Sequence, residues 1–381
     1  MIGLDVHPYL FSASALSGAD ALQAKEEWHV DRRPLDELEK VLTKHALPGD
    51  IIVLEAGGNS FAVAARIAKC GLTALVLESQ SVGKVGKAYC ANDRIDSVKI
   101  ARVYLSGLAH IVWAPDEKSA ERRELFFAHR NAVRDCTRIR NRIWGFLSQH
   151  CVRKPIGLRL SSAAAIKRLL SLHQWTATQT VLLQELVKAF QEAEARRTQF
   201  RRMIAEEVAN DPNILKLIRI LGIRDRIAFA LVAFIGNIER FANPKKLVAY
   251  FGLNPIVSFS GISGGTGKLS HYGRADIRSL LVQAAQSVLR CGKDNTHRWG
   301  VALKMRKGTN IAVTALARKL AVSVWYLLKG LFTPLADIDK TLSTKIHKIA
   351  SAIGLKRIRS LGFKTVTLFE KKLHEQLIQT T

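Results

Sequence analysis

Cysteine is scarce in this sequence and is not arranged for cross-linking or for zinc binding. The 381 residues contain an odd number of widely scattered cysteines, none of them spaced as Cys-x-x-Cys: Cys70, Cys90, Cys136, Cys151 and Cys291. Neither a disulfide framework nor a zinc knuckle is therefore encoded. We expect a reduced, cytoplasmic protein.

Long hydrophobic runs are also missing. The longest apolar run, residues 227–238, is about half the length needed to cross a bilayer and lies between Arg226 and Arg240. The first residues have no basic segment ahead of the apolar ones and place Asp5 among them, which argues against a signal peptide. We therefore expect a soluble protein with no membrane partner.

Acidic residues are few compared with basic ones. Asp and Glu number 32 and Lys and Arg number 58, which leaves a net charge of +26 and a pI near 10.2. This excess is larger than solubility requires, so a polyanion is the expected partner. With 48% hydrophobic residues and a mean hydropathy of +0.05, the charge belongs to a folded surface. A chain of this length is expected to form at least two domains.

The first part of the chain carries both strand and helix signals. Strands are predicted at residues 1–6, 9–16, 25–30, 51–54 and 72–77. The last two are continuous apolar runs, which are typical of strands buried on both faces. Helices are predicted over residues 36–45 and in the stretch that ends near residue 69. This pattern predicts a mixed α/β domain over residues 1–112.

Helical spacing replaces the strand signals after about residue 116. Two long basic helices are expected over residues 113–210, and they could pair as an antiparallel coiled coil. A mainly helical domain should follow over residues 211–332, interrupted by a polar loop at 258–271. Residues 333–381 are predicted to be a basic, weakly helical tail.

Four carboxylates are placed where they could converge. Asp5 lies at the end of the first strand and Glu55 directly follows a buried run, so parallel pairing of the two strands would bring both to one edge. Asp93 and Asp96 are three residues apart at the start of a helix, where both point to one face. Buried together, the four would repel one another unless a divalent cation neutralised them, and oxygen ligands suit Mg²⁺ or Mn²⁺. Two such ions about 4 Å apart can support phosphoryl transfer.

Each acid also has a purely structural interpretation. Asp93 could cap the helix, and Asp96 could pair with Lys99 or Arg94. Asp5 alone could be an ordinary turn residue, whereas a carboxylate that directly follows a buried strand usually needs a partner or a metal. The convergence of all four on two strands and a helix is more specific than any single acid.

A second candidate is the glycine-rich loop at residues 258–268. Its glycine spacing excludes a Walker A loop. It is either a flexible surface connection or a segment that presents a serine hydroxyl, with backbone amides and Lys268 available to phosphate oxygens. Arg274 and Arg278 begin the apolar helix that follows, where they suit phosphate contacts and a solvated helix start equally well.

Five short motifs together resemble one known family. They are Gly-Leu-Asp at 3–5, Leu-Glu-Ala-Gly-Gly at 54–58, Asp-Arg-Ile-Asp-Ser at 93–97, Gly-Leu-Asn-Pro at 252–255 and Ser-Gly at 260–261. In this order they are similar to the DEDD transposases of insertion sequences, the bridge-RNA-guided serine recombinases often called the "one hundred and ten" family. The resemblance covers about residues 1–110 and 214–290.

The resemblance implies a ribonuclease-H-like, or resolvase-like, domain and a mainly helical transposase domain with a long helical segment between them. The family's catalytic quartet, which binds Mg²⁺ or Mn²⁺, corresponds here to Asp5, Glu55, Asp93 and Asp96. The transposase domain supplies a nucleophilic serine, followed by glycine, five residues and a second glycine. This pattern matches Ser260, Gly261 and Gly267, so Ser260 is the expected nucleophile, with Ser258 and Ser263 as alternatives.

The resemblance also implies partners and an activity. A noncoding guide RNA would pair with donor and target DNA, and a homo-oligomer, dimer or tetramer, would join the acidic site of one subunit to the serine loop of another. The candidate nucleic-acid contacts are Lys268, Arg274, Arg278, Arg134, Arg138 and Arg142. The expected activity is site-specific DNA recombination through a 5′-phosphoserine link, in the bacterial cytoplasm at the nucleoid. Two alternatives remain, a metal-dependent junction nuclease that uses water and a noncatalytic nucleic-acid-binding protein.

Overall fold

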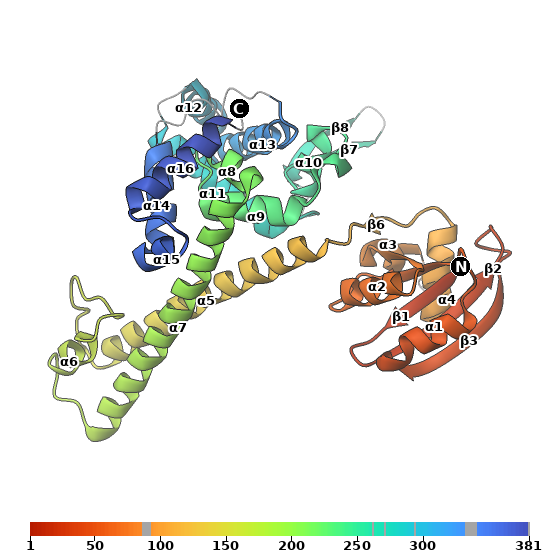
Figure 1. The fold of residues 1–381 in the computed structure, drawn as a ribbon, viewed down its shortest axis with the longest axis horizontal. Coiled ribbons are helices and arrows are strands. Elements are labelled where there is room, and N and C mark those ends of the chain that lie inside the picture. The colour runs from red at the N-terminus through yellow and green to blue at the C-terminus, as the bar shows by residue number, and fades with distance from the viewer. Residues whose placement is uncertain (86–92, 261–262, 270–271, 293–294, 332–340, 380–381) are drawn as a thin grey trace. The chain divides into compact units, whose positions relative to one another are not determined.

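The computed structural model describes residues 1–85, 93–260, 263–269, 272–292, 295–331 and 341–379. It divides into two compact units, residues 1–116 and residues 117–381 (Figure 1). The first unit is mixed α/β and the second is mostly helical, as the sequence predicts. The finer division of the chain at residues 112, 210 and 332 stays a prediction.

A six-stranded mixed sheet forms the centre of the first unit. Its strands are β1 (Ile2–Val6), β2 (Leu10–Ser17), β3 (Lys25–Pro34), β4 (Ile51–Glu55), β5 (Thr73–Leu77) and β6 (Ile111–Val112). They are ordered β3-β2-β1-β4-β5-β6. The first three form the predicted antiparallel meander, whereas β4 pairs parallel with both β1 and β5. The five predicted strands are confirmed, and β6 is too short to leave a pattern in the sequence.

Helices cover both faces of this sheet. They are η1 (Leu35–Glu37), α1 (Leu38–His45), α2 (Ser60–Lys69), α3 (Ser79–Val85) and α4 (Asp93–Leu105). Because side chains alternate along a strand, Ile52 and Leu54 enter the core with α1 and α2, whereas Val53 enters the core with α4. Gly3 and Asp5 of β1 lie on the α4 side by the same alternation.

The strand β1 and the helix α4 touch at Gly3. A Cβ atom added to Gly3 would lie 2.0 Å from the backbone oxygen of Ser97 and 3.0 Å from Ala101 Cβ. Only glycine therefore lets α4 approach the strand this closely. Next to this contact, the buried hydroxyls of Ser14 and Ser97 lie 2.8 Å apart and link β2 to α4.

Gly3→Ala should destabilise the first unit by about 2–3 kcal/mol, the usual cost of overpacking a core. The atom that the new methyl group would meet belongs to the backbone, so no rotamer change can relieve the clash. Denaturant unfolding of the full chain measures this loss. The matched control is Gly83→Ala, because a Cβ there meets nothing within 4 Å. Equal unfolding midpoints for the two variants would contradict the close approach.

Two long helices open the second unit and run antiparallel. They are α5 (Glu117–Gln149) and α7 (Ala177–Asn210), with α6 (Ala165–Leu170) in the connection. Arg122 near the start of α5 donates to Glu207 near the end of α7, whereas Cys136 farther along α5 donates to Glu194. The predicted antiparallel pair of helices is confirmed, and its coiled-coil geometry stays a prediction.

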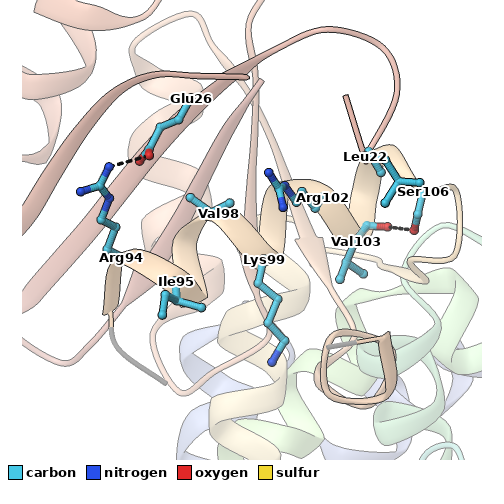
Figure 2. Close-up of a pocket in the computed structure, with 10 residues that line it drawn as sticks. Leu22, Glu26, Arg94, Ile95, Val98, Lys99, Arg102, Val103 and Ser106 are labelled. Atoms are coloured by element: carbon cyan, nitrogen blue, oxygen red, sulfur yellow. Dashed lines mark hydrogen bonds and ion pairs between the residues drawn. The ribbon is translucent and has the colours of Figure 1, made fainter. Parts of the chain in front are cut away.

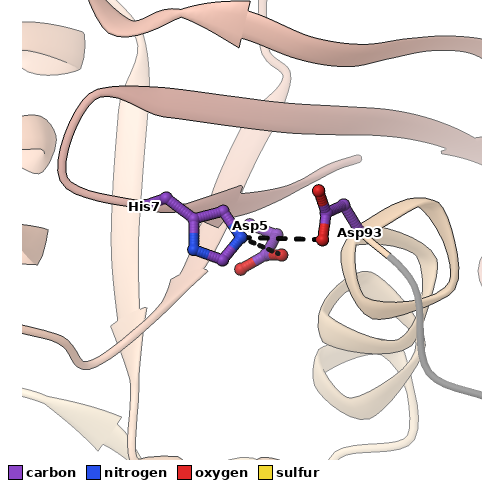
Figure 3. Close-up of side chains that lie close together, drawn as sticks. All are labelled: Asp5, His7 and Asp93. Atoms are coloured by element: carbon purple, nitrogen blue, oxygen red, sulfur yellow. Dashed lines mark ion pairs between the residues drawn. The ribbon is translucent and has the colours of Figure 1, made fainter.

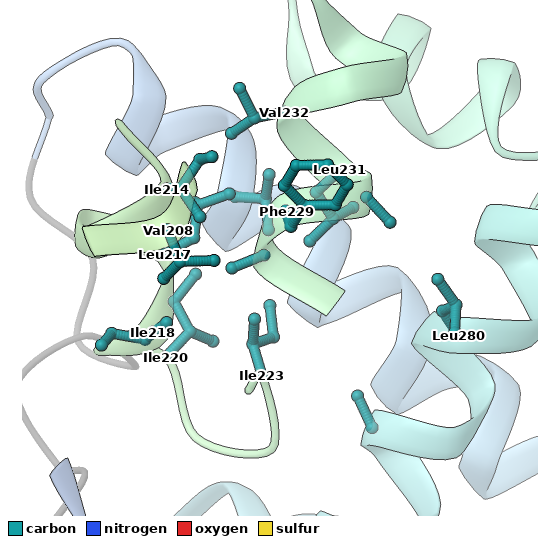
Figure 4. Close-up of a cluster of buried hydrophobic side chains, with 14 of the residues drawn as sticks. Val208, Ile214, Leu217, Ile218, Ile220, Ile223, Phe229, Leu231, Val232 and Leu280 are labelled. Atoms are coloured by element: carbon teal, nitrogen blue, oxygen red, sulfur yellow. The ribbon is translucent and has the colours of Figure 1, made fainter. Parts of the chain in front are cut away.

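The remaining helices pack around one large core. They are α8 (Pro212–Ile218), α9 (Asp225–Ile235), η2 (Ile238–Arg240), α10 (Pro244–Tyr250), α11 (Ala275–Cys291), α12 (Asn295–Lys307) and α13 (Thr309–Leu328). The helix α9 is apolar on nearly every side and is buried at the centre, as a helix without a polar face must be. Figure 4 shows Phe229, Leu231 and Val232 of α9 among side chains from its neighbours.

The C-terminal segment differs from the prediction of a weakly helical tail. It forms α14 (Leu342–Ile353), α15 (Leu355–Ser360) and α16 (Val366–Gln379). Ile349, Ile358 and Leu373 from these helices join the large core. Burial of these apolar side chains stabilises helices whose own sequence signals are weak.

The predicted polar loop is also wrong in form, because its backbone is a hairpin. The strands β7 (Pro255–Ser260) and β8 (Ser263–Leu269) pair antiparallel, with Ser260 opposite Ser263. Glycine and serine dominate β8 and have low strand propensity, so the sequence pattern alone favours a loop. Pairing with β7 supplies the backbone hydrogen bonds that overcome this preference.

The helix α13 is long and apolar enough, by length and composition, to cross a membrane. It is also a core helix of the second unit, since Leu316, Leu320 and Val324 are fully buried and α13 packs along α10, α11 and α12. The sequence of α13 does not stand out as a long apolar run, because Arg318 and Lys319 interrupt it.

Candidate metal centre

Two acids lie at one edge of the sheet in the first unit. Asp5 is next to last in β1 and Glu55 is the last residue of β4. These strands pair parallel, with Leu4 opposite Leu54, so the next residue of each strand emerges at the same edge. The sheet topology therefore gives the arrangement that the sequence predicts for this pair.

The helix α4 brings the other two acids to the same edge. Asp93 is its first residue and Asp96 lies one turn later, so both face the same way and both lie at the positive end of the helix dipole. The contact between Gly3 and Ser97 sets how close they come to β1. Helix and sheet thus each contribute two acids.

A histidine lies between the two groups of acids. His7 Nε2 is 3.5 Å from Asp5 Oδ2 and 3.6 Å from Asp93 Oδ1. Figure 3 shows its imidazole ring directed toward both carboxylates. Among the described residues, Asp5, His7 and Asp93 form a set whose donor atoms lie within 4.8 Å of one another, close enough to share a metal ion.

The electrostatics of Asp5 show that the acids repel one another. Burial raises the pKa of Asp5, His7 lowers it, and the charges of Asp96, Asp93 and Glu55 raise it further. The other three acids therefore lie near enough to act on Asp5, although they are far apart in the sequence. A cation bound among them would remove this repulsion.

The donors fit a divalent metal ion. Carboxylate oxygens suit Mg²⁺ and Mn²⁺, and an imidazole nitrogen is a common ligand of transition metal ions. Burial is the main cause of the raised pKa of Asp5, and the charges of Asp96, Asp93 and Glu55 add to it, so a bound cation would favour the ionised carboxylate. Asp5, His7 and Asp93 are the residues whose donor atoms lie close enough to hold the ion, and Glu55 and Asp96 act on Asp5 through their charge.

An exposed arginine neutralises part of this charge. Arg32 Nε in β3 donates to Asp93 Oδ2 at 2.9 Å. The backbone of Arg32 has φ = 47°, a left-handed conformation that is strained for a residue with a side chain. The buried Ser12 hydroxyl accepts a hydrogen bond from the Arg32 amide at 3.0 Å and supports this conformation. Asp93 is therefore paired with Arg32, and its interpretation as a helix cap stays a prediction.

Arg94, the residue after Asp93, pairs with Glu26 and not with Asp96, the partner considered from the sequence. The Nη2 atom of Arg94 donates to Oε2 of Glu26 in β3 at 2.7 Å. This ion pair closes one end of a pocket of about 590 Å³ that runs along α4 past Ile95, Val98 and Lys99 (Figure 2). None of the four acids lines this pocket.

The serine hairpin belongs to the second unit. Ser258 and Ser260 lie in β7, Ser263 begins β8, and Lys268 lies near the end of β8. For these four residues the structure describes the backbone only, so the predicted roles of their side chains lie outside the described atoms. Gly261 is outside the described residues.

The two arginines that follow the hairpin have partners within the protein. Arg274 Nη2 lies 2.9 Å from Asp276 Oδ2, and its guanidinium stacks 4.4 Å from the centre of the Phe234 ring. Arg278 Nη1 donates to the backbone oxygens of Gly252 and Tyr272 and so fixes the base of the hairpin. Phosphate contacts by either arginine stay a prediction.

The three arginines predicted on the basic helix are exposed. Arg134, Arg138 and Arg142 follow one another at four-residue spacing on α5, so they share one face. Arg138 pairs with Asp135 at 2.6 Å. Their surface position is compatible with nucleic-acid binding, which stays a prediction.

Two family models match the sequence, and they match the parts that carry these features. A DEDD transposase model of the IS110 family matches residues 2–152, and a model described as transposase IS116/IS110/IS902 family matches residues 215–299. The chain belongs to this transposase family. The first match contains all four acids, and the second contains the serine hairpin.

Relatives of the transposase agree with this membership. A probable family 20 transposase of Pseudomonas aeruginosa is 27% identical over 335 residues, which span 86% of this chain and 96% of the relative. The transposase for insertion sequence element IS1111A of Coxiella burnetii is 34% identical over 110 residues, which span 28% of this chain and 30% of that protein. The transposase is thus an enzyme that acts on DNA, and its family is one in which divalent metal ions are expected.

Sequence reasoning missed two residues of this centre, His7 and Arg32. His7 could have been predicted from the sequence, because residues two apart on a strand point to the same face. His7 is two residues after Asp5. Nothing in the sequence marks Arg32, because its approach to Asp93 depends on the pairing of β2 with β3 and on a left-handed backbone.

Proposed function

We propose that the transposase is an RNA-guided, site-specific DNA recombinase of an insertion sequence, in which a serine attacks the DNA backbone. The observation that carries this proposal is the convergence of Asp5, Glu55, Asp93 and Asp96 at one edge of the first unit. Acids that can hold a divalent ion suit a hydrolytic or transfer reaction at phosphorus, and a protein that only binds nucleic acid does not require them.

Each residue has a role in the proposed reaction. Asp5, Asp93 and His7 would hold the metal ion, and Glu55 and Asp96 would complete its surroundings. The ion, when bound, draws electron density from the phosphate and stabilises the charge that develops on its oxygens. A carboxylate of the quartet takes the proton of the Ser260 hydroxyl, and the serine oxygen then attacks phosphorus.

The bonds exchanged are balanced without an energy-rich cofactor. A bond forms between Ser260 Oγ and phosphorus, and the bond between phosphorus and the 3′ oxygen breaks. The 3′ oxygen takes up the proton that the carboxylate accepted, so the DNA strand leaves with a 3′ hydroxyl. A 3′ hydroxyl from the exchanged strand attacks the phosphoserine in the reverse sense and releases Ser260. Ser258 or Ser263 would take the same role if the nucleophile were shifted within the hairpin.

Basic surface on both units supports a polyanionic substrate. Lys99 and Arg102 line the pocket along α4 in the first unit, and the exposed arginines of α5 lie in the second. We propose that these surfaces hold donor DNA, target DNA and a noncoding guide RNA. We further propose a homo-oligomer that acts in the bacterial cytoplasm at the nucleoid.

The test is reaction of the purified full-length transposase, bound to the RNA transcribed from the flanking noncoding element, with DNA that carries the element ends. A denaturation-resistant protein–DNA adduct that needs a divalent ion is the expected product. Metal-dependent cleavage without an adduct would replace the proposal with a nuclease that uses water. Absence of both would leave a binding protein, and sequencing the copurified RNA tests the guide independently.

Binding to nucleic acid should depend steeply on salt. A net charge of +26 allows contacts with several phosphates, and each contact releases condensed counterions. We expect the logarithm of the association constant to fall with the logarithm of salt concentration with a slope of about −4 or steeper, which fluorescence anisotropy can measure. A flat response would remove the charge argument for a polyanionic partner.

A further inference from the structure

The side chain of His7 is held next to the acidic edge by contacts of its own backbone. Its amide donates to the Leu10 oxygen at 2.9 Å, and its carbonyl accepts a hydrogen bond from the Asn59 side chain at 3.0 Å. Pro8 follows and restricts the backbone of His7 to extended conformations. The turn between β1 and β2 therefore fixes the position of the His7 backbone, from which the imidazole side chain extends.

The spacing of the donor atoms is that of ligands around one ion. An octahedral ion with bonds of about 2.1 Å holds neighbouring ligand atoms about 3 Å apart. His7 Nε2 lies 3.5 Å from Asp5 Oδ2 and 3.6 Å from Asp93 Oδ1, so inward shifts of about 0.5 Å bring each pair to that spacing. These distances are longer than ordinary hydrogen bonds, which leaves room for an ion to join the three groups.

We propose that His7 Nε2 is a direct ligand of the metal ion that Asp5 and Asp93 bind, and that this nitrogen makes the centre prefer Mn²⁺ to Mg²⁺. The proposal rests on the proposed function, because it needs a metal centre at this edge. It concerns which residue binds the ion and which ion is bound.

The preference follows from the ligand chemistry. Mg²⁺ is a hard ion that binds oxygen and keeps its waters, so it gains little from an imidazole. Mn²⁺ accepts the same carboxylates, and as a transition metal ion it binds nitrogen more strongly than Mg²⁺ does. A site built only from Asp and Glu offers no nitrogen ligand to distinguish the two ions. His7 therefore sets the preference of the centre for Mn²⁺ over Mg²⁺.

The competing interpretation is that His7 is a cation that pairs with the two aspartates. An ion pair would place the ring in the same position without any metal contact. The two interpretations differ in one observable, which is whether the imidazole nitrogen is coupled to the electron spin of bound Mn²⁺.

Pulsed electron paramagnetic resonance of Mn²⁺ bound to the full-length transposase tests the assignment directly. With natural histidine we expect echo modulation from one coupled nitrogen-14 nucleus, and with nitrogen-15-labelled histidine we expect that modulation to change to the nitrogen-15 pattern. This comparison needs no substitution, so it does not depend on whether a variant folds. Bound Mn²⁺ without nitrogen coupling would overturn the assignment.

Affinities measured on variants test the selectivity. In His7→Ala and His7→Asn, Mn²⁺ affinity should fall about tenfold or more, while Mg²⁺ affinity, measured by competition, should change by less than about twofold. His110→Ala changes another exposed histidine of the first unit and should leave both affinities unaltered. Equal losses for the two ions would overturn the preference for Mn²⁺.

The result for Asp5→Asn separates this proposal from the proposed function. If wild-type protein binds Mn²⁺ and Asp5→Asn does not, the acidic centre exists, and only the spectrum decides the role of His7. If wild-type protein binds no divalent ion in a manner that depends on Asp5, the metal centre itself is absent and both proposals fail.

Discussion

Asp5→Asn will reduce metal-dependent DNA cleavage by about 10³-fold or more while leaving DNA binding nearly unchanged. Asp5 has the central position among the acids, because it lies beside His7 and the charges of the other three acids all raise its pKa. Loss of the ion removes several kcal/mol of stabilisation of the charge that develops at phosphorus, and each 1.4 kcal/mol corresponds to a factor of ten. Cleavage assays with saturating divalent ion measure the effect.

The same variant will be more stable than the wild type when no divalent ion is present. The pKa of Asp5 is raised in the folded protein, so its stabilising contribution is present below the ordinary pKa of aspartate and is lost as pH rises through the raised value. Asparagine carries no charge and avoids this loss at neutral pH. We expect a higher unfolding temperature for Asp5→Asn without metal, and stabilisation by added metal only in the wild type.

Asp20→Asn is the matched control for this variant. Asp20 is exposed in the turn between β2 and β3, at the opposite edge of the sheet from Asp5, and asparagine keeps the oxygen that accepts from the Leu22 amide. Its substitution should alter neither cleavage nor the effect of metal on unfolding. Full cleavage by Asp5→Asn would remove the acidic edge from the mechanism.

Ser260→Ala will abolish the covalent protein–DNA adduct and lower strand exchange by about 10⁴-fold or more, the scale of loss when a nucleophile is removed. No other group takes the place of a missing serine oxygen in a transfer that conserves the phosphate bond. Metal binding in the first unit should stay intact, because all of its ligands lie within residues 1–116. Adduct formation on a labelled oligonucleotide is the measurement.

Ser258→Ala and Ser263→Ala decide the position of the nucleophile within the hairpin. Ser263 lies opposite Ser260 in the register of β7 and β8, and Ser258 is two residues earlier on β7. Loss of the adduct in one of these variants instead would move the role to that serine. An adduct that persists in all three would show that the protein uses another nucleophile.

The strands and the acidic edge of the first unit could be predicted because their signals are local. A buried strand is a short apolar run, and the acid that ends it must lie at an edge of the sheet, as Glu55 does after Ile51–Glu55 forms β4. Parallel pairing then places Asp5 beside it without further information. The three-residue spacing of Asp93 and Asp96 at a helix start predicted that both face one way, and the start of α4 carries them.

The features that escaped prediction depend on tertiary contacts. The helices α14 and α16 owe their stability to apolar side chains that join a core built from distant segments. The strand β8 is rich in glycine and serine and becomes a strand through its pairing with β7. Arg32 reaches Asp93 only because the sheet holds its backbone in a left-handed conformation. None of these leaves a pattern in a single stretch of sequence.

The close fit of Gly3 against Ser97 joins the two halves of the centre, the sheet and the helix α4. Asp5 and Glu55 are carried by the sheet, Asp93 and Asp96 are carried by one helix, and the hydroxyl pair of Ser14 and Ser97 lies in the seam between them. Widening this seam by the thickness of a methyl group separates the halves while every acid stays in its own sequence position. Random mutagenesis of this enzyme would therefore yield inactive clones with substitutions along the seam as well as at the acids. In the seam clones all four acids would be present, and the distance between the sheet pair and the helix pair would be too long.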